Sequence, residues 1–257
     1  MDIRNHILEG ANFKQTPNIH GSKIMGPKFL IIHYSGSGDT AGTVAWLTKR
    51  GSNASAHIVI GRDGEVWQLA SFDQRAWHCG ESEWNGMKFL NGCSIGIEFV
   101  NQGPLTKDND GVFWSKWRHR IPADEVEQAT HKNELEPRYW HKYTDAQLAK
   151  GAEVARAILA AYTSIEMILG HDDIAPGRKI DPGPLFPMNQ FLIDCGFMDA
   201  PEPAPITDAL IMGPALFTLK GGILYVTVSD KEGDVTAELN PEEADALCDW
   251  LNKKMKA

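Results

Sequence analysis

The chain has few cysteines, no excess of positive charge and no long apolar run, and each feature excludes a class of protein. Its four cysteines, Cys79, Cys93, Cys195 and Cys248, lack the close paired spacing of a disulfide framework or a four-cysteine zinc site. We therefore expect reduced thiols with structural roles. The formal charge of −9 and the pI of about 5.5 argue against nucleic-acid or anionic-membrane partners, because both require a basic surface.

No apolar run is long enough to cross a bilayer, and the first ten residues lack the charged-then-apolar pattern of a secretory signal. We therefore expect a protein that is cytoplasmic as synthesised and does not insert into membranes. The hydrophobic content of 42% is ordinary for a globular chain. A length of 257 residues allows one large domain with a small appendage.

The segment 170–184 carries three prolines and three glycines, so it cannot form a regular helix or strand. Its composition predicts a rigid, irregular loop. Such a loop can bring His171, Lys179 and Asp181 together, although they are separated along the chain. An imidazole and a carboxylate are two of the ligand types that zinc takes, and a catalytic zinc needs three protein ligands beside an open position.

The best candidate for a third ligand is His33. It follows the apolar run 29–32 and precedes a loop rich in glycine and serine. This pattern predicts a buried strand that delivers a histidine to the sheet edge where sites of α/β proteins tend to lie. Taken alone, His33 could equally be a structural histidine at the end of a strand.

Five segments in this order carry a resemblance to a known family: His33 after its strand, Ser55–Gly64, Ala76–His78, Ser94–Glu98 and Gly170–Pro184. With them the chain resembles the zinc-dependent N-acetylmuramoyl-L-alanine amidases, over roughly residues 20–195. Their superfamily also contains phage lytic amidases and the peptidoglycan recognition proteins. The resemblance implies an α/β fold, with a central mixed sheet surrounded by helices and the zinc cleft at the strand ends.

The resemblance also implies a reaction and a set of residues for it. One Zn²⁺ per chain would be bound by His33, His171 and Asp181. The bond hydrolysed would be the amide between the lactyl group of N-acetylmuramic acid and the L-alanine of the stem peptide. Glu98 would act as general base, and Lys179 would stabilise the charge on the carbonyl oxygen.

The alternative function is a non-catalytic recognition protein that binds peptidoglycan or muropeptides. Some relatives of that kind have lost zinc ligands, whereas this chain has the full set, which favours the enzyme. Glu98 supports the same choice, because it interrupts the apolar run Cys93–Val100. Burying its charge without a partner would cost several kcal/mol, and water at a metal is a suitable partner. The alternatives are a solvent-facing Glu98 on an edge strand and a solvated Lys179 in the loop.

Four further residues are predicted to contact the substrate: Tyr34, His57, Trp77 and His78. Trp77 and His78 begin a loop rich in aromatic and small residues, and sugar and peptide ligands often lie against an indole face. His57 lies in the first of two β-rich runs, 56–61 and 65–70, which predict a hairpin. The alternatives are a packed histidine at 57, a core tryptophan at 77 and a His78 that bonds a backbone carbonyl.

The rest of the first 198 residues supplies the scaffold of the predicted catalytic domain. Residues 1–28 indicate an arm that wraps the domain without joining its core, and helices are predicted at 40–50, from 144 to about 162, and at 188–195. Residues 103–143 resemble an insertion that many cell-wall amidases carry, which could cover the cleft and bind glycan or stem peptide. We expect its histidines, His119, His131 and His141, at the surface.

Residues 199–205 form a proline-rich linker. Beyond it, 206–257 is predicted to be a small α+β appendage with strands at 222–229 and 235–239 and a helix at 241–254. Such a unit could dock on the catalytic domain, pair with a second copy or bind a partner. Three roles are compatible with the sequence: muropeptide recycling, lysis by a prophage enzyme, and export without a cleaved signal. The insertion and the appendage favour a role other than recycling alone.

Overall fold

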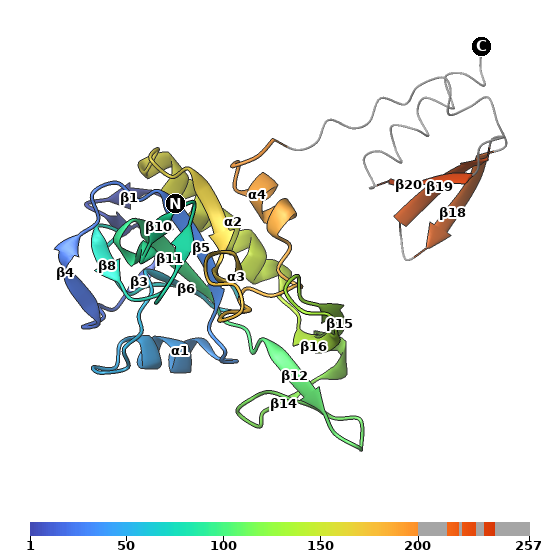
Figure 1. Cartoon of the computed structure of the whole chain (residues 1–257), viewed down its shortest axis with the longest axis horizontal. Coiled ribbons are helices and arrows are strands. Elements are labelled where there is room, and N and C mark those ends of the chain that lie inside the picture. The colour runs from blue at the N-terminus through green and yellow to red at the C-terminus, as the bar shows by residue number, and fades with distance from the viewer. Residues whose placement is uncertain (200–214, 221–222, 230–233, 240–257) are drawn as a thin grey trace, which may run out of the picture. The chain divides into compact units, whose positions relative to one another are not determined.

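The computed structural model describes residues 1–199 and the strand segments 215–220, 223–229 and 234–239 (Figure 1). The chain divides into two compact units, Met1–Asp199 and Ala200–Ala257. In the described part of the chain, no helix has the length and apolar character needed to span a membrane. Cys79, Cys93 and Cys195 are free thiols, as predicted, and Cys248 lies outside the described residues.

A six-stranded mixed sheet forms the centre of the first unit, which confirms the predicted α/β fold (Figure 1). In spatial order its strands are β17 (Met167–Gly170), β5 (Phe29–Tyr34), β11 (Ser94–Phe99), β6 (Ile58–Ile60), β7 (Val66–Gln68) and β3 (Asn12–Phe13). The pairs β17–β5, β5–β11, β11–β6 and β3–β7 are parallel, whereas β6 and β7 form the predicted antiparallel hairpin. The carboxyl ends of three neighbouring parallel strands, β17, β5 and β11, therefore meet at one edge.

Side chains alternate in direction along a strand, so the two faces of this sheet carry different residues. Ile32 and Ile97 belong to the largest hydrophobic cluster, together with Val154 and Ile158 of α2 (Asp145–Ala161). The next residues along the two strands, His33 and Glu98, consequently point to the opposite face. One sheet face is thus sealed by a helix, and the other is available for a polar site.

The helices predicted in the first unit are present, with small differences at their ends. The helix α1 (Thr40–Leu47) begins after Asp39, whose side chain accepts the Gly42 N–H, and ends at Leu47, three residues before the predicted end. The helix α2 has a reciprocal capping box between Thr144 and Gln147. Near the end of the unit, α4 (Met188–Asp194) follows the site loop as predicted.

The N-terminal segment differs from its prediction. It forms β1 (Ile3–Arg4), β2 (Ile7–Leu8), β3 and β4 (Ile19–Lys23), and β4 pairs with β8 (Gln74–Ala76). Leu8 is 1% exposed within the main core, and β3 completes the edge of the central sheet. The prediction that residues 1–28 stay outside the core is therefore wrong. Strands of two residues show no alternation in sequence, so no periodic signal indicated them.

The insertion forms a sheet of its own, which we call the inserted sheet (residues 104–141; Figure 1). Its five antiparallel strands are β14 (Arg120–Ile121), β13 (Phe113–Trp114), β12 (Pro104–Lys107), β16 (Pro137–His141) and β15 (Val126–Thr130). His119 is exposed as predicted, but His131 and His141 are 1% and 4% exposed. The prediction of surface positions for these two histidines is wrong, because each is paired with a carboxylate inside the fold.

Short elements complete the first unit. They are β9 (Glu83–Trp84), β10 (Met87–Lys88), the single helical turn α3 (His171–Ile174) and two 3-10 turns, Leu90–Gly92 and Ala123–Glu125. The described residues of the second unit form three antiparallel strands, β18 (Ala215–Lys220), β19 (Ile223–Ser229) and β20 (Asp234–Leu239). Its two predicted strands are confirmed and β18 was not predicted. The predicted helix at 241–254 and most of the linker lie outside the described residues, and the role of this unit stays a prediction.

Candidate metal centre and catalytic cleft

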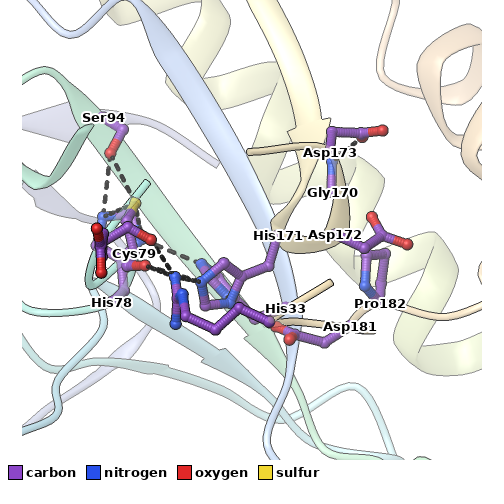
Figure 2. Close-up of polar contacts among 12 residues, drawn as sticks. His33, His78, Cys79, Ser94, Gly170, His171, Asp172, Asp173, Asp181 and Pro182 are labelled. Atoms are coloured by element: carbon purple, nitrogen blue, oxygen red, sulfur yellow. Dashed lines mark hydrogen bonds and ion pairs between the residues drawn. The ribbon is translucent and has the colours of Figure 1, made fainter. Parts of the chain in front are cut away.

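Three predicted ligands converge on one point at the carboxyl edge of the central sheet (Figure 2). His33 lies near the end of β5, His171 begins α3 directly after β17, and Asp181 lies in the following loop. The two Nδ1 atoms are 2.9 Å apart, and Oδ2 of Asp181 lies 3.0 Å from Nδ1 of His33 and 2.9 Å from that of His171. All three residues are buried. Two imidazoles and one carboxylate thus present three donor atoms to a shared position.

The far side of each imidazole ring is held by a partner, which fixes its orientation. Nε2 of His171 lies 2.9 Å from the carbonyl oxygen of Cys79. Because a carbonyl only accepts, this nitrogen carries the ring proton and leaves the Nδ1 lone pair directed at the shared position. Nε2 of His33 lies 3.1 Å from Nδ1 of His78, whose ring crosses that of His33 at 89°. Both rings therefore have the outer support that histidine ligands usually have.

The electrostatics of the three residues suit a metal ion. Burial, followed by the neighbouring His171, lowers the pKa of His33 to about 4, so the His33 imidazole is neutral at pH 7. Burial alone would raise the pKa of Asp181, but the adjacent imidazoles of His171 and His33 outweigh it and hold the pKa below its ordinary value. A neutral imidazole and an ionised carboxylate are the forms that bind metal. This buried triad can hold a metal ion, and its donor set fits zinc.

Glu98 lies next to His33 in the sheet. The two residues are in register on β11 and β5, so their side chains project to the same face. Oε2 of Glu98 is buried and has no hydrogen-bond partner among the described residues. Burial, and then the charge of Asp181, raises the Glu98 pKa to about 8, against the opposing charge of Lys179. A buried carboxylate oxygen without a protein partner indicates that a water or substrate group belongs beside it.

A cleft of about 710 Å³ opens over these groups. Its lining includes the triad, Glu98 and Lys179, so the structure brings together all five residues predicted for metal binding and catalysis. Of the predicted substrate-contacting residues, Tyr34, Trp77 and His78 also line it. The size and mixed lining of the cleft suit a ligand with both sugar and peptide parts.

His57 is the exception among the predicted substrate contacts. It is 0% exposed and does not line the cleft. Its Nε2 lies 2.8 Å from the carbonyl oxygen of Gln74, and its Nδ1 accepts the Gly96 N–H at 3.0 Å. Both ring nitrogens are therefore used by the backbone, and the prediction that His57 contacts the substrate is wrong. It is a packed histidine that ties β11 to the segment around β8.

Sequence reasoning missed several residues of the cleft. Trp46 of α1 is 54% exposed and lines it, and Trp117 of the inserted sheet, 60% exposed, donates its indole N–H to Gly36 O at 2.7 Å. Arg178, which was not among the predicted site residues, donates to the carbonyl oxygen of Cys79 at 2.7 Å. Because His171 uses the same carbonyl, Arg178 helps to fix that histidine. Its position beside Lys179 was the available signal, but its direction depends on the folded loop.

Gly96 makes room for His78 and so supports the metal centre. A Cβ at position 96 would lie 2.4 Å from Nδ1 of His78, the atom that meets His33. We expect Gly96→Ala to displace the His78 ring, to lower stability by about 1–3 kcal/mol and to weaken metal binding. Thermal unfolding and metal titration by competition with a chromogenic chelator would measure both effects.

The matched control is Gly21→Ala in β4, because a Cβ there meets nothing within 4 Å. This variant should keep the wild-type metal affinity. Equal metal affinities in Gly96→Ala and the wild type would show that His78 does not support His33.

The fold and the site define an α/β protein with a buried metal-binding triad at the ends of its parallel strands. The chain belongs to the N-acetylmuramoyl-L-alanine amidase family, whose model matches residues 23–184. It is similar to the 1,6-anhydro-N-acetylmuramyl-L-alanine amidase AmpD of Escherichia coli K12, with 36% identity over 140 residues, 54% of this chain and 57% of that protein. It is also similar to the N-acetylmuramoyl-L-alanine amidase AmiD of the same strain, with 32% identity over 171 residues, 63% of this chain and 51% of that protein.

Solved structures agree with this assignment. A crystal structure of a selenomethionine derivative of AmpD matches with a TM-score of 0.55 and 27% identity, over 76% of this chain and 99% of that one. Escherichia coli AmiD, in complex with the substrate anhydro-N-acetylmuramic acid-L-Ala-D-γ-Glu-L-Lys, matches with a TM-score of 0.50 and 30% identity. The match covers 73% of this chain and 60% of that one. The chain spans about half the length of the curated relatives it matches.

Proposed function

We propose that this protein is a zinc-dependent N-acetylmuramoyl-L-alanine amidase that hydrolyses the bond between the muramoyl lactyl group and L-alanine. The observation that carries the proposal is the position of Glu98, whose buried carboxylate oxygen has no protein partner in the described chain and lies on the strand next to the His33 ligand. A structural metal site is closed by its ligands and needs no such group. An open cleft, a complete donor triad and a potential base fit a hydrolase better.

Each residue has a defined task in this proposal. His33, His171 and Asp181 hold the zinc, which when bound acidifies water and polarises a carbonyl group. Glu98 accepts the proton of the attacking water and returns it to the departing alanine nitrogen. Lys179 lines the same cleft and can stabilise the negative charge that develops on the carbonyl oxygen. Its charge acts on both Glu98 and His33, which supports a place near the reacting atoms.

The proposed substrate is a muropeptide or the peptide-bearing glycan of peptidoglycan. The AmiD structure that this chain resembles contains an anhydro-muramoyl peptide, and both curated relatives are named as amidases of this class. In this chain, three tryptophans line the cleft: Trp46 on α1, Trp77 directly after β8, and Trp117 in the inserted sheet. Indole faces suit the apolar faces of sugar rings, while the Tyr34 hydroxyl offers a polar contact.

The test is hydrolysis of a purified muropeptide by the zinc-loaded full chain, followed by mass spectrometry. We expect release of the intact stem peptide with a free L-alanine amino group, with the mass of one water added across the two products. Cleavage between two sugars or within the peptide would contradict the proposal, even if zinc were required.

A further inference from the structure

The backbone of the site loop is tied together at Asp172, the residue after His171. The Asp172 N–H donates to the carbonyl oxygen of Asp181 at 2.8 Å (Figure 2). Because Asp172 directly follows His171, this hydrogen bond connects the backbone at the two proposed ligands. The Asp172 side chain is only 4% exposed and points away from the shared donor position. Its placement therefore fixes the spacing of His171 and Asp181 without adding a ligand.

The inserted sheet supplies the partners of this buried carboxylate. Nε2 of His131 lies 2.8 Å from Oδ2 of Asp172, and His131 is 1% exposed. Nδ1 of His131 accepts the Asn133 N–H at 3.1 Å, so the ring proton is on Nε2 and is donated to Asp172. Lys132 reaches Oδ1 of the same carboxylate at 2.9 Å. A segment about 40 residues earlier in the chain thus holds the site loop through consecutive side chains.

The same part of the chain contacts the other end of the loop. Trp140 stacks on His131, with ring centroids 6.1 Å apart, and packs against Gly183, where a Cβ would lie 2.9 Å from its ring. Just beyond the inserted sheet, Tyr143 donates its hydroxyl proton to the carbonyl oxygen of Pro182 at 2.7 Å. The two residues that follow Asp181 are therefore held from outside the loop.

We infer that the inserted sheet buttresses the metal centre and that His131 is a positioning residue acting through Asp172. The inference rests on the proposed function for the identity of the metal. By this inference, the insertion does more than line the cleft. The loop 170–184 is irregular and would not by itself fix the distance between His171 and Asp181, whereas contacts with the inserted sheet do. Loss of an outer partner of this kind typically costs about 10- to 100-fold in metal affinity.

His141 provides a matched control for this inference. Like His131, it belongs to the inserted-sheet segment, is nearly fully buried and is paired with a carboxylate, Glu125, at 3.0 Å. Its partner bonds Arg62 and not the site loop. Substituting either histidine removes a buried imidazole from a carboxylate, so the two variants share the loss of packing and differ in the connection to the metal centre.

The experiment measures zinc affinity of the full chain by chelator competition, with thermal unfolding of each metal-free variant. We expect His131→Ala to weaken zinc binding about 10- to 100-fold, whereas His141→Ala changes it less than about twofold despite a comparable loss of stability. His131→Gln keeps an N–H donor and should recover part of the affinity. If His131→Ala does not fold, Lys132→Ala provides the test, because it removes the exposed partner of the same Asp172 carboxylate. This variant should also weaken zinc binding.

Equal zinc affinities in the wild type and these variants would overturn the inference, as would equal losses in His131→Ala and His141→Ala. Either result leaves the amidase proposal intact, because it concerns metal binding without hydrolysis. A wild-type chain that binds no zinc would instead contradict the proposed function.

Discussion

Asp181→Ala is expected to abolish zinc binding and hydrolysis together. The carboxylate is the single negative charge of the proposed donor set, and its Oδ2 lies within 3.0 Å of both imidazole nitrogens. Two neutral histidines alone do not complete the three-ligand site of a catalytic zinc. The loss of affinity should exceed the roughly 100-fold that removal of an outer partner costs. Chelator competition and release of stem peptide measure the two losses.

A thermal-shift experiment separates metal binding from misfolding in this variant. Zinc at about 100 times its dissociation constant stabilises the folded state by roughly 2.7 kcal/mol, which for a domain of this size raises Tm by about 5–10 °C. The wild type should show this rise and Asp181→Ala should not. Asp194→Ala, which removes an exposed carboxylate on α4, serves as the control, and its Tm should rise with zinc as in the wild type. A zinc-dependent rise in Asp181→Ala would exclude Asp181 as a ligand.

Glu98→Gln is expected to leave zinc binding intact and to lower hydrolysis by roughly 10²–10⁴-fold, the usual contribution of a general base. Glutamine has nearly the same volume but cannot accept and return a proton. The variant should therefore bind zinc and muropeptide with wild-type affinity while its kcat falls. Hydrolysis within tenfold of the wild-type rate would mean that another group takes the proton.

The raised pKa of Glu98 gives a second, activity-independent readout. In the metal-free protein, burial raises this pKa from 4.5 to about 8, so between these values the folded state holds a proton that the unfolded state has released. By linkage, this group's contribution to stability is present below pH 4.5 and is lost as the pH rises through about 8. Glu98→Gln has no such titration, so its Tm advantage over the metal-free wild type should grow from pH 5 to pH 8. A constant difference would contradict the burial of Glu98.

The sequence predicted the parts of the site that lie on regular elements or in a strongly punctuated loop. His33 follows an apolar strand, and the prolines and glycines of 170–184 indicate an irregular backbone that can gather His171, Lys179 and Asp181. Glu98 was visible because a single carboxylate in an apolar strand demands an explanation. The central mixed sheet was implied by the family resemblance, whereas the main helices followed from periodicity and capping residues.

The residues that the sequence could not place depend on contacts between distant segments. His131 looks like a surface histidine in a polar stretch, and only the docking of the inserted sheet shows that it meets Asp172. His57 has a strand position that suits either packing or substrate contact, and the backbone groups of Gln74 and Gly96 decide for packing. Local pattern describes an element, whereas the partner of a polar side chain is a property of the tertiary fold.

The measurement that tests the central claim most directly follows a defined anhydro-muropeptide by mass spectrometry while its binding is measured calorimetrically, with zinc-loaded wild type and Glu98→Gln side by side. We predict that both proteins bind the muropeptide and that the wild type alone releases the stem peptide at the lactyl–alanine bond. If both bind it and neither cleaves it, the chain is a muropeptide recognition protein and the proposed catalytic roles of Glu98 and Lys179 are wrong.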